Sequence, residues 1–221
     1  NTDLMVQING IVNEYIHVEK PDQEAVPSRQ FDISKIDFDL LSREFAHTRR
    51  KNLLLRDLDE LVNQQLAKML FANPQRIDYY DRYQEIIDAY NAEQNRATIE
   101  KTFMDLMELA SSLDTEQQRY VREGFSSDEE LSVYDLLFSE NLTKQEIETI
   151  KKVSVDLLTK IKQQIAKLDH WTDKQETKAI VDNLIRNTLW QELPNSYDVS
   201  DIQTYQKKIY EYVYMRYPEV A

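Results

Sequence analysis

The stretch TKQEIETIKKVSVDLLTKIKQQIAKL, residues 143–168, indicates how this chain folds. Its apolar residues recur at intervals of one, three, four or seven, which places them on one face of an α-helix. They are Ile147, Ile150, Leu157, Leu158, Ile161, Ile165 and Leu168. Thr143 and Glu146 have the spacing of a capping box, in which each side chain binds a free backbone amide of the first turn. The stretch therefore predicts an amphipathic helix that begins just after Thr143.

The same periodicity covers most of the remaining chain. We expect further helices over about 3–15, 37–71, 77–90, 98–113, 127–138, 172–193 and 200–216. Thr172 and Gln175 have capping-box spacing, and a proline-containing stretch over 18–34 has few apolar residues. The sequence thus predicts an all-α fold, an irregular helical bundle of about eight helices with no significant sheet. We expect an N-terminal helix and linker over 1–34 and a helical assembly domain over 35–221.

The composition excludes several classes of enzyme. The only glycines of the chain are Gly10 and Gly124, whereas a phosphate-binding loop or a dinucleotide fingerprint needs two or three glycines close together. Cysteine is absent, which removes disulfides, thiolate metal sites and cysteine nucleophiles. We therefore expect no bound nucleotide cofactor and no cysteine-based chemistry in this chain.

The net charge of the chain is strongly negative, 27 − 40 = −13. The molecule as a whole should repel the phosphate backbone of nucleic acids. Arg49, Arg50 and Lys51 form a local basic cluster, for which we consider contact with phosphate. The commoner alternative is a solvated helix face whose cations pair with neighbouring carboxylates. Those carboxylates are Asp57, Asp59 and Glu60.

Two Glu-x-x-His pairs allow a metal site as an alternative. They are Glu14 with His17 and Glu44 with His47, and this spacing supplies ligands in di-iron helical bundles. The two pairs are separated by the proline-containing stretch, and His47 adjoins the basic cluster, which opposes binding of a dication. Histidines that are solvated or cap a helix are therefore the favoured interpretation.

The expected last helix is unusually rich in tyrosine. We expect Tyr210, Tyr214 and Tyr217 to form an outward stripe, while the inward face is formed by Tyr205, Ile209 and Tyr212. Tyrosine is enriched at protein interfaces, so the stripe suggests docking on a partner. A core helix whose hydroxyl groups reach the surface explains the same pattern equally well.

Several strings resemble the C-terminal helical region of the R (restriction) subunit of type I restriction-modification enzymes. The most specific is NPQRIDYYDRYQEIIDAYN, residues 73–91, which follows a similar stretch over 53–70. Further similarity lies over 32–38, 141–158, 171–177 and 210–217. The resemblance thus covers nearly the whole chain.

This resemblance implies a larger parent subunit with a nuclease domain and a motor that uses ATP and Mg²⁺ to translocate DNA. The C-terminal helices of such subunits are thought to hold them on the methyltransferase and specificity subunits. None of the nuclease or motor motifs occurs here, so no catalytic residue is transferred to this chain. Because the chain opens at Asn1 without a methionine, we interpret it as a fragment. A free-standing acidic helical adaptor is the alternative.

The resemblance and the composition also bear on location. The longest purely apolar run is Met69–Ala72, far below the roughly twenty residues needed to cross a bilayer. We expect a cytoplasmic protein without membrane contact.

Overall fold

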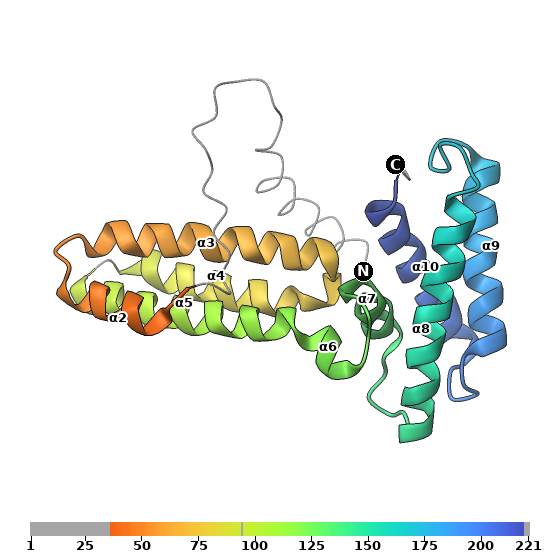
Figure 1. Cartoon of the computed structure of the whole chain (residues 1–221), viewed down its shortest axis with the longest axis horizontal. Helices are drawn as coiled ribbons and strands as arrows, with labels where there is room; N and C mark the ends of the chain where they lie inside the picture. Colours follow the sequence, from red (N-terminus) through yellow and green to blue (C-terminus); the bar gives the residue numbers. More distant parts are fainter. Residues whose placement is uncertain (1–35, 94, 219–221) are drawn as a thin grey trace. The chain divides into compact units, whose positions relative to one another are not determined.

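The computed structural model describes residues 36–93 and 95–218 (Figure 1). Over these residues the chain forms nine α-helices and one short 3₁₀ helix, with no strand. The all-α prediction is confirmed, although the helix expected over 3–15 and the linker over 18–34 lie outside the described residues. The chain divides into two compact units, Asn1–Arg119 and Tyr120–Ala221. The sequence pattern does not predict this division, and the boundary expected at 34/35 stays a prediction.

Unit 1 is built on three long helices that lie side by side (Figure 1). They are α3 (Lys51–Ala72), α4 (Ile77–Ala92) and α5 (Arg96–Gln117), with α2 (Phe38–His47) before them and the 3₁₀ helix η2 (Pro74–Arg76) between α3 and α4. Both α3 and α4 pack on α5. The core between them is apolar and includes Leu58, Leu66, Phe103, Leu106 and Leu113. Its hydrophobic burial is the main favourable term for folding of the unit.

The single helix expected over 37–71 is wrong, because the chain breaks between His47 and Lys51. The Thr48 hydroxyl accepts a hydrogen bond from the Arg50 amide at 3.1 Å in this break. The break accompanies burial of Phe45, which is 5% exposed and stacks on Phe103 of α5 with ring centroids 3.6 Å apart. Stacking across 58 positions is a tertiary contact, so the local periodicity carries no sign of it.

Unit 2 contains four packed helices and a short one. The short helix is α6 (Arg119–Glu123), which begins at the last residue of unit 1, and the others are α7 (Asp128–Leu137), α8 (Lys144–Ile165), α9 (Gln175–Glu192) and α10 (Val199–Arg216). Each of the four packs on the next, and α10 packs on α7, so the four helices enclose one core. Fully buried side chains from each of these four helices fill the core, among them Leu131, Ile150, Leu157, Ile185 and Ile209.

The two predicted capping boxes had different outcomes. The one at Thr143 is confirmed: the Thr143 amide donates to Glu146 Oε2 at 2.8 Å, and the Glu146 amide donates to Thr143 Oγ1 at 3.3 Å. The one at Thr172 is wrong, because α9 begins at Gln175 after Lys174 and has no side-chain cap. Thr172 instead donates its hydroxyl to the Pro218 carbonyl at 3.3 Å. Over the described residues, no helix has the length and apolar character needed to cross a membrane.

Candidate interaction surface

The residue after the C-terminal end of α10 is hydrogen-bonded to the connection between α8 and α9. Trp171 lies in this connection and is 1% exposed. Its indole Nε1 donates a hydrogen bond to the Tyr217 carbonyl at 2.6 Å. A buried indole N–H needs such a partner, because leaving it unpaired costs about 1–3 kcal/mol. This bond fixes the position of the tyrosine-rich helix against α9.

Tyr210 and Tyr214 pack on Trp171 from the surface side. Their ring centroids lie 6.2 Å and 5.7 Å from that of Trp171, in edge-on geometry, and the two tyrosine rings stack at 6.2 Å. The Lys178 ammonium of α9 lies 5.6 Å from the centre of the Tyr214 ring. Tyr214 remains 39% exposed. We call these four side chains, Trp171, Lys178, Tyr210 and Tyr214, the aromatic patch.

The aromatic patch is partly desolvated even before any partner binds. Burial raises the pKa of the Tyr210 hydroxyl, and the nearby Asp182 and Tyr214 raise it further. Because the rings already contact one another and the buried indole, little rotamer freedom remains to be lost on binding. Rigid aromatic area with a polar edge is typical of interface anchors.

Tyr217 does not belong to the outward stripe, contrary to expectation. Its ring meets that of Tyr212 edge-on at 6.4 Å, and the Lys162 ammonium lies 5.3 Å from its centre. Its hydroxyl is buried, and this burial raises the pKa of that group. Ile209 and Tyr212 face the core as expected, at 0% and 1% exposure. Tyr217 therefore contributes to the packing of unit 2 and not to the outward stripe.

A carboxylate of α7 links three helices near Tyr217, and nothing in the local sequence predicts it. Glu129 forms ion pairs with Lys162 of α8 and, at 3.6 Å, with Arg216 of α10. Burial alone would raise the pKa of Glu129, but Lys162, Tyr217 and Arg216 together hold it below its usual value. The partners lie 33 and 87 positions away along the chain, which is why local patterns do not reveal the cluster.

The most specific string of the resemblance has a structural role in unit 1. Asn73 is fully buried, and its side chain accepts a hydrogen bond from the Gln75 amide at 3.1 Å, which caps η2. Arg76, 3% exposed, pairs with Glu116 of α5 at 3.0 Å, and Arg119 contacts the same carboxylate oxygen at 2.9 Å. The string thus joins the start of α4 to the end of α5.

The basic cluster makes different contacts from those expected. Lys51 pairs with Glu100 of α5 at 2.6 Å and lies 4.9 Å from the centre of the Phe45 ring. Arg96 contacts the same carboxylate at 3.2 Å, and these two cations lower the pKa of Glu100. The expected pairing with Asp57, Asp59 and Glu60 is not found among the described residues. Asp59 instead accepts a hydrogen bond from the Tyr83 hydroxyl at 2.7 Å.

The metal alternative concerns two sequence pairs. Glu14 and His17 lie outside the described residues. Glu44 and His47 lie in the last turn of α2, and both are exposed. Over residues 36–93 and 95–218, no group of three or more carboxylate or histidine side chains is placed to hold a metal ion.

Fold and surface together define a class: an acidic helical module with a small aromatic patch. The family comparison is more specific, since the model for the C-terminal part of type I restriction enzyme HindI endonuclease subunit-like proteins matches residues 3–217. The chain belongs to this family. No curated protein and no solved structure matches the chain.

Proposed function

We propose that this chain is a non-catalytic docking module, which holds a type I restriction endonuclease subunit on its methyltransferase and specificity subunits. The observation that carries the proposal is the family match over 3–217. In the parent enzyme, ATP and Mg²⁺ would be bound by other domains of the subunit, which would also translocate and cut the DNA. The chain itself would then neither hydrolyse ATP nor cut DNA.

The aromatic patch is the docking surface in this proposal. It offers rigid aromatic area held in place by Trp171, and Tyr214 is still 39% exposed to a partner. Lys178 adds a cation beside the ring. Interface hot spots are enriched in Tyr, Trp and Arg and surrounded by contacts that exclude water. The patch combines the aromatic part of this composition with a rigid support.

The test measures how tightly the intact endonuclease subunit binds the methyltransferase and specificity subunits. Tyr214→Ala should weaken binding by about 2 kcal/mol, or roughly 30-fold, as expected for truncation of a hot-spot residue. Isothermal titration calorimetry measures this change. ATP hydrolysis by the subunit should not change, because the proposal places the motor elsewhere.

Tyr205→Ala is the matched control on the same helix. Tyr205 is also partly buried and makes one edge-on aromatic contact, with Tyr197 at 5.5 Å, away from the patch. Both variants lose a tyrosine of α10 and should lose similar stability, but only Tyr214→Ala should lose affinity. Equal losses of affinity in the two variants would assign the effect to folding, and unchanged affinity in Tyr214→Ala would refute docking through the patch.

A further inference from the structure

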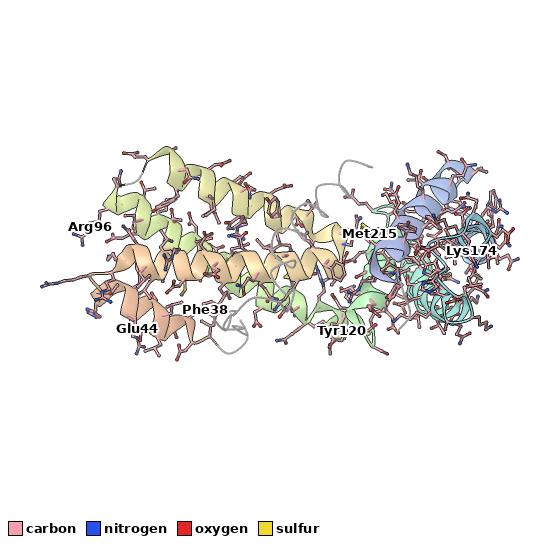
Figure 2. All side chains as sticks on the ribbon, turned by 90° about the horizontal axis from the view of Figure 1, so that it is seen from above. Phe38, Glu44, Arg96, Tyr120, Lys174 and Met215 are labelled. Atoms are coloured by element: carbon pink, nitrogen blue, oxygen red, sulfur yellow. The ribbon has the colours of Figure 1, made fainter. Side chains whose placement is uncertain are left out.

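The corner of unit 1 where α3 begins gathers cations from three segments of the chain. The break after α2 contributes Arg49 and Arg50, and α3 contributes Lys51. The ion pairs at Glu100 bring Arg96, the first residue of α5, to the same corner. Figure 2 shows Arg96 at this end of unit 1. We call Arg49, Arg50, Lys51 and Arg96 the basic corner.

The charges of the basic corner are only partly neutralised. Glu100 is shared by Lys51 and Arg96, so the four cations and this one paired carboxylate together carry a charge of +3. Arg49 and Arg50 are exposed, and among the described residues neither guanidinium group forms an ion pair or a hydrogen bond, since the bond to Thr48 uses the Arg50 backbone amide. Arg96 is 85% exposed despite its contact with Glu100. Three guanidinium groups are therefore open to solvent.

The break in the helix creates this arrangement. In one continuous helix, Arg49 and Arg50 would point in directions about 100° apart. The break instead places them in the connection before α3. The first turn of α3 contains no acidic residue, and no side chain caps it. Its free amides add partial positive charge beside the guanidinium groups.

We propose that the basic corner binds the phosphate backbone of a nucleic acid. Guanidinium groups match phosphate oxygens with two parallel hydrogen bonds, which favours arginine where phosphate is bound. The rest of the chain is acidic: without the four cations of the corner and Glu100 it carries 23 − 39 = −16. A polyanion is therefore repelled by the net charge of the rest of the chain and attracted by the basic corner. The inference does not rest on the docking role proposed above.

Lys51 has a positioning role in this proposal and does not contact phosphate. Its ammonium is held by Glu100 and lies over the Phe45 ring, and its side chain is only 21% exposed. These contacts connect α2, α3 and α5 and so keep the cations of the three segments together. The phosphate contacts are assigned to Arg49, Arg50 and Arg96.

The test is a salt titration of binding between this chain and a fluorescent DNA duplex, followed by anisotropy. Each phosphate contact adds about −0.9 to the slope of log affinity against log salt, so three contacts give about −2.7. A tenfold rise in salt should then weaken binding about 500-fold in the wild type. In Arg49→Gln/Arg50→Gln only one contact remains, and the loss should be about 8-fold.

The matched control is Arg56→Gln/Arg186→Gln, which removes the same charge from two exposed arginines elsewhere. Arg56 lies on α3 itself and neighbours Asp57 at 3.8 Å, and Arg186 lies on α9. The control should keep the wild-type slope. An equal fall in slope in both double variants would show a response to overall charge and would overturn the site.

A second variant keeps the test valid if the double variant does not fold. Glu44 is an exposed carboxylate near the same end of unit 1 (Figure 2), and Glu44→Gln should tighten binding to the duplex. Unchanged or weaker binding would contradict the proposed location. Displacement of the duplex by polyglutamate at equal charge concentration would assign the corner to an acidic protein and would overturn the proposal. The absence of any binding to the duplex at low salt would also overturn it.

Discussion

The buried ion pair between Arg76 and Glu116 gives the strongest test of the fold. The two side chains are 3% and 9% exposed, and Arg76 Nε lies 3.0 Å from Glu116 Oε1. Glu116→Gln keeps the size of the side chain but removes the charge that compensates Arg76. Breaking a buried pair in this way typically costs about 3–5 kcal/mol. Because a domain is stable by only about 5–15 kcal/mol, unit 1 should lose a large part of its stability.

Glu108→Gln is the matched control for this substitution. Glu108 lies on the same helix and also pairs with an arginine, Arg82, at 2.9 Å, but it is 73% exposed. Exposed pairs contribute about 0–1 kcal/mol, so this variant should be almost as stable as the wild type. Urea denaturation followed by circular dichroism measures both. A loss below about 1 kcal/mol for Glu116→Gln, equal to the control, would refute the argument from burial.

Two further predictions concern unit 2. The pKa of Glu129 is held below its ordinary value by its cationic partners, so its ion pairs stabilise the unit above that ordinary value, and this stability is lost as the pH falls through the lowered pKa. Thermal melts from neutral to acidic pH should show a smaller acid-dependent loss in Glu129→Gln than in the wild type, and equal losses would contradict this. Tyr197→Phe removes the hydrogen bond from the Tyr197 hydroxyl to the Leu137 carbonyl at 2.7 Å and should cost about 1 kcal/mol in urea denaturation. A stability equal to that of the wild type would show that water replaces the bond.

Local sequence patterns predict those parts of the fold that depend on neighbouring residues. The capping box of Thr143 and Glu146 is an example, because both partners lie within one turn. The apolar positions of α8 are another, since six of the seven expected residues lie in this helix and five of them are buried. The all-α class follows from many such local signals together.

Contacts between distant residues account for what the sequence patterns missed. The break before Lys51 accompanies the stacking of Phe45 on Phe103, and the wrong cap at Thr172 reflects its bond to Pro218. The same holds for the candidate sites. The high tyrosine content indicated α10, but only tertiary contacts distinguish Tyr214, which is exposed and packs on Trp171, from Tyr217, whose hydroxyl is buried.

The proposed docking role of this chain in an endonuclease subunit can be tested directly. The most direct measurement is a competition experiment, in which the isolated chain is titrated into a complex of the intact subunit with the methyltransferase and specificity subunits. The chain should bind those subunits and displace the intact subunit in proportion to its concentration, and Tyr214→Ala should need roughly 30-fold more protein for the same effect. Failure of the folded wild-type chain to displace the subunit at any concentration would contradict the account.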